Sequence, residues 1–314
     1  MEKFITVDGG TTNTRISLVI NGKITDTVKY HVGAGACHTD KKPLYSALRE
    51  GIEALLSRNG ISEGEIACVI ASGMITSEGG LCTLPHLTAP VGLNELGAEL
   101  YKTFFPEITT LPFCFIRGVK TVSEPCLELD MMRGEETELF GLLESPEADC
   151  VYVLPGSHTK IISVDGEHRI IGFCTSLTGE LIEAVASNTI LKRSVSLNGC
   201  EIDRRQLMSG YTYAKENGLP SALFKVRVID RMLSLPPSAA FGFFLGAVLQ
   251  GDVDTVCASP SLRVVVGGKR ELREPLAYLI RSVCTKSVIE ADDETCANAA
   301  SLGAVRIYKA SLTE

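Results

Sequence analysis

The sequence of 314 residues lacks several features that mark common protein classes. Its eleven cysteines never stand at C-x-x-C spacing, and their odd number and scatter indicate neither a disulfide framework nor a zinc cluster. Positive charge is in deficit, because 30 Lys and Arg face 38 Asp and Glu, and a net charge of −8 argues against nucleic acid as a partner. We therefore expect a cytoplasmic protein that binds no nucleic acid.

Long apolar runs are missing as well. The longest nearly apolar run, 239–249, lies between Pro237 and Asp252 and is shorter than the roughly 20 residues of a membrane span. No charged segment followed by an apolar one opens the chain, so we expect neither export nor a membrane partner. The 45% of hydrophobic residues suffice for two cores, and the length favours two domains.

A loop rich in glycine and threonine stands near the start, DGGTTNTR at 8–15. Apolar and β-branched residues flank it, and Asn21-Gly22 marks a tight turn, so the loop joins two strands of a hairpin. A P-loop would instead run from a strand into a helix and carry Gly-Lys-Ser/Thr. This loop offers N–H and hydroxyl donors to an oxyanion, and Asp8 is placed to attract Mg²⁺. The alternative is an ordinary β-turn with a capping Asp.

A second stretch, CVYVLPGSHTKIISVDG at 150–166, repeats the same scheme of strand, loop, strand and turn. With one loop residue deleted, Gly10-Thr11-Thr12 corresponds to Gly156-Ser157-His158. Two matching hairpins indicate an internal duplication, with one loop in each lobe. Because His158 lies in the loop, we expect it to contact phosphate; the alternative is a hydrogen-bonded core histidine.

Apolar spacing predicts helices at 43–58, ending at Asn59-Gly60, and at 94–104. A buried strand near 66–71 leads into Ser72-Gly73-Met74, a loop in which the backbone must approach another group closely. We assign Gly73 and Met74 to substrate binding.

The acidic segment DMMRGEETELFG, at 130–141, is the strongest candidate for catalysis. Acidic residues at a helix start are favoured by the helix dipole, so a purely structural role is one interpretation. The other is that one carboxylate accepts a proton from an alcohol during phosphoryl transfer, as kinases require.

Four motifs occur in order along the chain: MRGEET at 132–137, LPGSHTK at 154–160, TGEL at 178–181 and FGFFLGAV at 241–248. With these motifs the sequence resembles the 2-dehydro-3-deoxygalactonokinase family of the sugar kinase, Hsp70 and actin superfamily. The resemblance covers nearly the whole chain, although Gly9 stands where close relatives usually have Trp. It implies an α/β fold of two lobes, the actin-like ATPase (ribonuclease H-like) fold, with a duplicated β-hairpin phosphate loop.

The resemblance also implies the ligand-binding residues. ATP and Mg²⁺ are the implied cofactors, and Asp8 would hold the metal. The residues that would bind the nucleotide are Asp8, Gly10, Thr11, Thr12, Asn13, Gly156, Ser157, His158, Gly267 and Gly268. Glu135 would be the catalytic base, with Glu136 in reserve. The planar fork of arginine matches a carboxylate, so Arg133 is our candidate anchor for the substrate carboxylate; the alternative is a surface arginine that pairs with Asp130 or Glu136. Thr178, Gly179 and Glu180 would complete the substrate site.

The predicted organisation is an N-terminal lobe at 1–129, a C-terminal lobe at 130–300 and a final helix at 301–314 that returns to the first lobe. The predicted function is phosphorylation of 2-dehydro-3-deoxygalactonate, a small sugar acid, by MgATP at the 6-hydroxyl. A kinase for another keto-deoxy sugar acid or sugar, and a non-catalytic nucleotide-dependent regulator, are the alternatives. The sequence leaves open whether the chain forms a homodimer.

Overall fold

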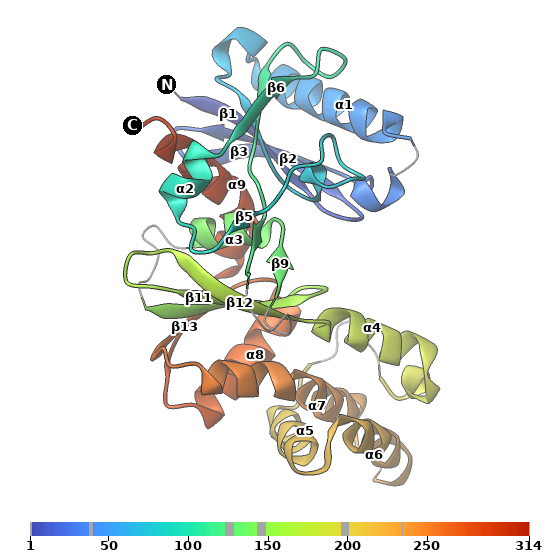
Figure 1. The fold of residues 1–314 in the computed structure, drawn as a ribbon. Helices are drawn as coiled ribbons and strands as arrows, with labels where there is room; N and C mark the ends of the chain where they lie inside the picture. The colour runs from blue at the N-terminus through green and yellow to red at the C-terminus, as the bar shows by residue number, and fades with distance from the viewer. Residues whose placement is uncertain are drawn as a thin grey trace. The chain divides into compact units, whose positions relative to one another are not determined.

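The computed structural model describes residues 2–37, 40–122, 129–142, 149–195, 201–233 and 235–313 (Figure 1). Packing divides the chain into two compact units. Unit 1 comprises residues 1–148, 164–172 and 294–314, and unit 2 comprises residues 149–163 and 173–293. The sequence predicts that a second lobe begins at residue 130, whereas the described residues 130–142 pack with unit 1.

Unit 1 is built on a six-stranded sheet of order β3-β2-β1-β4-β7-β6. Its strands are β1 Lys3–Gly9, β2 Thr14–Ile20, β3 Lys23–Tyr30, β4 Val69–Gly73, β6 Tyr101–Phe104 and β7 Pro112–Phe115. β1 pairs antiparallel with β2 and parallel with β4. Asn21 and Gly22 both have positive φ, 51° and 76°, which allows the tight turn into β3 and confirms the predicted hairpin.

The helices of unit 1 are α1 Lys42–Asn59, α2 Leu93–Ala98, α3 Glu135–Leu142 and α9 Asp293–Ala310. α1 buries Leu44, Leu48 and Ile52 and ends at Gly60 in the left-handed conformation, as the sequence predicts. The predicted helix at 94–104 is wrong beyond Ala98. Residues 101–104 instead pair with β7 as an edge strand, and this long-range pairing overrides the helical spacing of the segment.

Close helix packing ties α3 to α9. A Cβ on Gly141 would lie 1.7 Å from the Ala299 carbonyl oxygen, and one on Gly303 would lie 1.9 Å from that of Thr137. Near the other end of α9, the rings of Tyr308 and Phe4 lie 5.4 Å apart. A small sheet of β5 Leu87–Thr88, β8 Val119–Lys120 and β9 Met131–Met132 completes the described part of unit 1.

Unit 2 contains a five-stranded sheet of order β12-β11-β10-β13-β14. Its strands are β10 Cys150–Leu154, β11 Thr159–Val164, β12 Ile170–Ser176, β13 Arg263–Val266 and β14 Ser287–Glu290. The order matches β3-β2-β1-β4-β7 of unit 1 strand for strand, and in both sheets the first strand in sequence pairs parallel with the fourth. This shared topology confirms the predicted duplication.

The helices of unit 2 are α4 Thr178–Asn188, α5 Arg204–Asn217, α6 Leu219–Met232, α7 Pro237–Ala258 and α8 Arg270–Val283. Figure 1 shows α5, α6 and α7 gathered in one group. Glycines allow this packing, because a Cβ on Gly246 would lie 1.8 Å from the Leu207 carbonyl oxygen and one on Gly210 would lie 2.0 Å from that of Phe243. The FGFFLGAV motif therefore serves the α5–α7 contact.

α7 is longer than the apolar run suggests. Its 22 residues are long and apolar enough to cross a membrane, but 67% of the most apolar window is buried within the structure, as in the core helix of a soluble protein. Cys257, near its end, forms a disulfide with Cys284 after α8. Cysteine spacing does not predict this cross-link, because the two residues lie 27 positions apart and meet only where α7 packs on α8.

Candidate active site

The first loop of the duplicated pair, Gly10–Asn13, is closed by a hydrogen bond from the Gly10 N–H to the Asn13 carbonyl, 2.8 Å. The segment that follows β3 braces it, since the N–H groups of Ala34 and Gly35 donate to Gly10 and Thr11 at 3.1 and 2.9 Å. Thr11 and Thr12 are exposed. The loop therefore has a fixed backbone and free hydroxyl-bearing side chains.

Three glycines bring the start of α3 beside Asp8. Gly73 has φ +81°, and a Cβ there would lie 2.5 Å from the Gly9 carbonyl oxygen and 3.6 Å from Asp8 Oδ1. Gly134 has φ +116°, and its own Cβ would lie 3.2 Å from the Gly73 Cα. Because both backbones are in regions that side chains disfavour, only glycine permits this approach. The structure therefore brings together Asp8, Gly73 and the start of the helix that carries Glu135. The sequence predicts these residues separately, for metal binding, substrate binding and catalysis.

The carboxylates at this junction act on one another. Burial raises the pKa of Asp8, with Arg15 opposing and the charge of Glu135 adding to the rise. Burial, with the charges of Glu135 and Asp8, raises the pKa of Glu138 to about 8. Sequence reasoning did not single out Glu138, although it lies one helical turn beyond Glu135. The shared negative charge favours a cation or a proton at this point.

The two candidate bases differ in exposure. Glu136 is fully buried, and both its carboxylate oxygens accept from the Gly134 N–H at 2.9 and 2.8 Å. Burial and the charge of Glu135 raise the pKa of Glu136 to about 7. Glu135 is partly exposed, and its Oε2 accepts from the Arg133 main-chain N–H at 3.0 Å. This geometry makes Glu136 a cap of the helix and leaves Glu135 as the accessible carboxylate.

The Arg133 side chain has a structural role that the sequence does not reveal. Its Nη1 donates to the Thr76 carbonyl at 2.8 Å, and its Nη2 donates to the Leu84 carbonyl at 2.9 Å. Nη2 also lies 3.2 and 3.3 Å from the ring nitrogens of His86. Two nitrogens of the Arg133 guanidinium are therefore already bonded to the chain on either side of the segment 77–83, which leaves fewer donors for the predicted contact with a substrate carboxylate.

The second loop, Pro155–His158, is braced by the start of α4. A Cβ on Gly179 would lie 2.0 Å from the Gly156 carbonyl oxygen, and the Glu180 N–H donates to the Ser157 carbonyl at 3.0 Å. His158 Nε2 lies 3.0 Å from Glu180 Oε1. Gly179 and Glu180, predicted to bind substrate, thus contact the predicted phosphate loop.

Two buried charged residues hold the segment 175–178, which leads into the start of α4. Asp252 of α7 is buried and accepts from the hydroxyls of Ser176 and Thr178 at 2.6 and 2.7 Å. Lys160, in the strand after the loop, is only 5% exposed, and its Nζ donates to Thr175 Oγ1 at 2.6 Å. Asp252 has no sequence signal because its partners lie more than 70 residues away. Burial of a lysine without a partner is costly, and the hydrogen bond to Thr175 reduces that cost for Lys160.

Gly267 and Gly268 lie against this loop, directly before α8, whose first turns line a cavity. The Gly267 N–H donates to the Val153 carbonyl at 2.9 Å. Gly268 has φ +77°, and a Cβ there would lie 2.5 Å from the Pro155 carbonyl oxygen. Buried Arg273 donates to the Gly268 carbonyl at 3.0 Å. The predicted adenosine motif therefore lies directly against the predicted phosphate loop.

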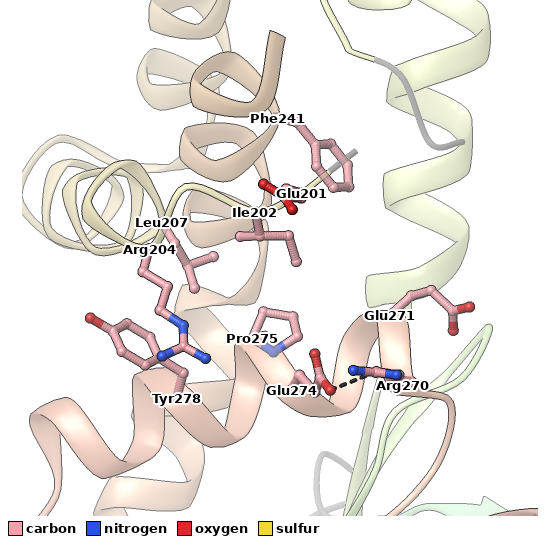
Figure 2. A pocket seen from close by; sticks show the side chains of 10 residues that line it. All are labelled: Glu201, Ile202, Arg204, Leu207, Phe241, Arg270, Glu271, Glu274, Pro275 and Tyr278. Carbon is pink, nitrogen blue, oxygen red and sulfur yellow. Dashed lines mark hydrogen bonds and ion pairs between the residues drawn. The ribbon is translucent and has the colours of Figure 1, made fainter. Parts of the chain in front are cut away.

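The cavity has a volume of about 410 Å³ and opens beside the first turns of α8 (Figure 2). Its walls are Glu201, Ile202, Arg204, Leu207, Phe241, Arg270, Glu271, Glu274, Pro275 and Tyr278. Figure 2 shows Arg204 beside Tyr278, and the guanidinium lies 5.2 Å from the ring centroid. Aromatic, apolar and charged groups together suit a nucleoside, whose base is flat and whose ribose is polar.

In the described residues, no group of three or more His, Cys, Asp or Glu has the geometry of a metal site. This does not exclude Mg²⁺, which typically takes one or two protein carboxylates together with water and phosphate oxygens. The half-buried Asp8, with the charge of Glu135 acting on it, fits that limited protein contribution.

Solved structures share the fold. A Sinorhizobium meliloti protein assigned as a 2-dehydro-3-deoxygalactonokinase matches 99% of this chain and 100% of its own, with a TM-score of 0.77 and 19% identity. The activator of the 2-hydroxyisocaproyl-CoA dehydratase from Clostridium difficile, solved with bound ADPNP, matches 99% of this chain and 96% of its own, with a TM-score of 0.52 and 13% identity. These likenesses confirm the predicted actin-like ATPase (ribonuclease H-like) fold.

Sequence similarity identifies the family. A Rhizobium meliloti protein assigned as the 2-dehydro-3-deoxygalactonokinase DgoK1 is 41% identical over 133 residues, which span 41% of this chain and 40% of that protein. The matched segment is therefore less than half of that relative. The profile of the 2-keto-3-deoxy-galactonokinase family matches residues 8–302, nearly the whole chain. The chain belongs to the 2-keto-3-deoxy-galactonokinase family.

Proposed function

We propose that this protein is an ATP-dependent kinase that phosphorylates 2-dehydro-3-deoxygalactonate at its 6-hydroxyl. Family membership supports the reaction. The observation that carries the proposal is the contact of Gly73 with Gly9 and Gly134, which places the Glu135 helix beside Asp8. A kinase needs a proton acceptor close to the metal ion that neutralises phosphate charge. The contact would bring the proposed base, Glu135, close to the proposed metal ligand, Asp8.

Glu135 is the proposed base. Its carboxylate takes the proton of the 6-hydroxyl as the hydroxyl oxygen attacks the γ-phosphorus of ATP. The bond from that phosphorus to the bridging oxygen breaks, and ADP leaves with the electron pair. Glu136 does not suit this role because it is fully buried and bonded to the Gly134 N–H.

Asp8 is the proposed protein ligand of Mg²⁺. The ion, when bound, supplies positive charge that neutralises the transferring phosphoryl group. The chain's own contribution is to hold Asp8 at the end of β1 against Gly73 and to fix the adjacent loop through Ala34 and Gly35. Mutual repulsion of Asp8, Glu135 and Glu138 would be relieved by the bound cation.

Unit 2 is the proposed nucleotide-binding unit. The loop Gly156–His158 would bind phosphates through its N–H groups and the Ser157 hydroxyl. The base would enter the cavity at the start of α8, which Phe241 and Tyr278 help to line. We further propose that the protein works in the cytoplasm.

An ADP-release assay, coupled to NADH oxidation, over a panel of sugar acids and uncharged sugars tests the function. We expect turnover with 2-dehydro-3-deoxygalactonate and ³¹P NMR evidence of a 6-phosphate ester. ADP release without a phosphorylated acid would contradict the proposed kinase. A higher kcat/KM for another keto-deoxy acid would reassign the substrate.

A further inference from the structure

Asp252 of α7 is a buried acid that no step of the proposed reaction uses. It is only 3% exposed, and its carboxylate accepts hydrogen bonds from the hydroxyls of Ser176 and Thr178 at 2.6 and 2.7 Å. The two hydroxyl oxygens lie 2.8 Å from each other. Among the residues that the structure describes, Asp252 forms no ion pair. Because burial of a charged group without a cation is costly, the carboxylate depends on these two hydroxyls, and the segment 176–178 is held against α7.

The start of α4, which this acid holds, packs on the second loop. A Cβ on Gly179 would lie 2.0 Å from the Gly156 carbonyl oxygen and 2.8 Å from the Ser157 Cα. The Glu180 N–H donates to the Ser157 carbonyl at 3.0 Å, and Glu180 Oε1 lies 3.0 Å from His158 Nε2. All of these residues belong to unit 2. Because the backbones touch, the loop cannot keep its position if the start of α4 moves.

The same segment is also tied to the strand that follows the loop. Lys160 of β11 donates to the Thr175 hydroxyl at 2.6 Å, and Thr175 directly precedes the residues that bond to Asp252. The segment 175–178 is therefore attached to β11 at one end and to α7 at the other. Asp252 is the residue of α7 that makes this attachment.

We propose that Asp252 is a positioning residue for the phosphates of ATP. Through Ser176 and Thr178 it fixes the start of α4, which in turn fixes the loop 156–158 in the conformation that binds phosphate. The inference rests on the proposed function, and it moves residues 178–180 from the predicted substrate site to the support of this loop. A loop that is already ordered loses less conformational entropy on binding, so it binds its ligand more tightly. A carboxylate does not attract phosphate itself, so the effect of Asp252 reaches ATP through the hydrogen bonds alone.

Calorimetric titrations with MgADP and with adenosine test the proposal without turnover. Asp252→Ala should raise the dissociation constant of MgADP about tenfold, as expected for lost hydrogen bonds to a charged group, and leave that of adenosine within about threefold, because adenosine has no phosphate. Asp252→Asn should recover most of the loss, since an amide can hydrogen-bond to both hydroxyls. Ser176→Ala should also weaken MgADP binding, whereas Ser176→Thr keeps the hydroxyl and should weaken it less.

Asp254 supplies the matched control on the same helix. Its carboxylate accepts from Tyr211, Lys215 and Gln250 at 2.6, 2.9 and 2.8 Å. Residues two positions apart lie on nearly opposite sides of a helix, and the partners of Asp254 lie on α5 and α7 rather than at the start of α4. Asp254→Ala should therefore lower Tm, as Asp252→Ala does, and leave the dissociation constant of MgADP unchanged.

A double-mutant cycle shows whether Asp252 acts through the start of α4. The losses of MgADP affinity in Asp252→Ala and Gly179→Ala should be less than additive, because both changes disturb the same contact. Fully additive losses would overturn the proposal.

Three further outcomes would overturn the positioning role. The first is unchanged MgADP binding in Asp252→Ala, and the second is an equal loss of MgADP and adenosine, which would indicate general damage to unit 2. The third is tighter MgADP binding by Asp252→Asn than by wild type, because the carboxylate would then act by repelling phosphate. The expected pattern in a protein that phosphorylates no sugar acid would keep the positioning role and refute the proposed reaction.

Discussion

The two hairpins share a strand order but differ in the acidic groups around the first strand. In unit 1 that strand carries Asp8 next to its last residue, and Glu135 and Glu138 add negative charge. In unit 2 the equivalent position is the apolar Leu154. A cation follows the loop in both hairpins, Arg15 in one and Lys160 in the other. We propose that the first copy binds a metal ion and that the second binds phosphate oxygens.

The loops also differ in what braces them. Main-chain N–H groups from a neighbouring loop fix the first, whereas the start of a helix fixes the second through Gly179 and Glu180. Helix N-termini carry partial positive charge, so the second brace adds to the anion preference. Substitutions in each loop should therefore affect different kinetic constants.

The largest effect should come from removing the proposed base, Glu135, in unit 1. Glu135→Gln is expected to lower kcat by roughly 10²–10⁴ while leaving ATP binding intact, the usual size for a lost general base. Glu136→Gln is the matched control and should keep kcat within about tenfold, because its carboxylate caps the helix. Rapid-quench and steady-state measurements compare the two. The reverse ranking would make Glu136 the base.

A smaller effect concerns the free energy of unfolding, which the buried carboxylate of Glu136 lowers when it is ionised. The pKa of Glu136 is raised to about 7 in the fold, so the folded state binds its proton more tightly than the unfolded chain does. Stability is therefore greatest below the ordinary carboxyl pKa and falls as pH rises through about 7, by an amount on the order of 3 kcal/mol. Glu136→Gln should flatten this fall in Tm between pH 5 and pH 8. The same dependence of Tm on pH in the variant and the wild type would show that ionisation of Glu136 does not destabilise the fold.

A still smaller effect should follow from disturbing the contact between Gly179 and the second loop. Gly179→Ala places a methyl group against the Gly156 carbonyl oxygen, and overpacking of this kind typically costs about 1–3 kcal/mol. We expect KM for ATP to rise about tenfold and KM for the sugar acid to stay nearly constant. Gly251→Ala, in open space on α7, is the control. Equal rises in KM for ATP and KM for the sugar acid would show that the second loop does not act on ATP binding alone.

The smallest effect should follow from His158→Asn. The ion pair of His158 with Glu180 is exposed on both sides, so its loss should cost little stability. Because we expect His158 to contact phosphate, KM for ATP should rise a few fold while KM for the sugar acid stays nearly constant. An unchanged KM for ATP would assign the residue a structural role.

The sequence predicts the local features of this site and misses the long-range ones. Both hairpins, the end of α1 at Gly60 and the start of α3 follow from residues close together in sequence. The partners of Arg133, by contrast, are 47 to 57 positions away, and no pattern within its own segment reveals them. The edge strand at 101–104 was missed for the same reason, since pairing with β7 decided its conformation.

The return of α9 to unit 1 has a consequence for synthesis on the ribosome. Unit 1 begins with the first strand, yet Gly303 and Tyr308 supply contacts to Thr137 and Phe4, and Lys309 pairs with Glu2 at 2.5 Å. All of unit 2 is translated before these contacts exist. The nascent first unit therefore stays incomplete until α9 has been made, while the second can finish folding, and a truncation within α9 would remove part of the first unit's core.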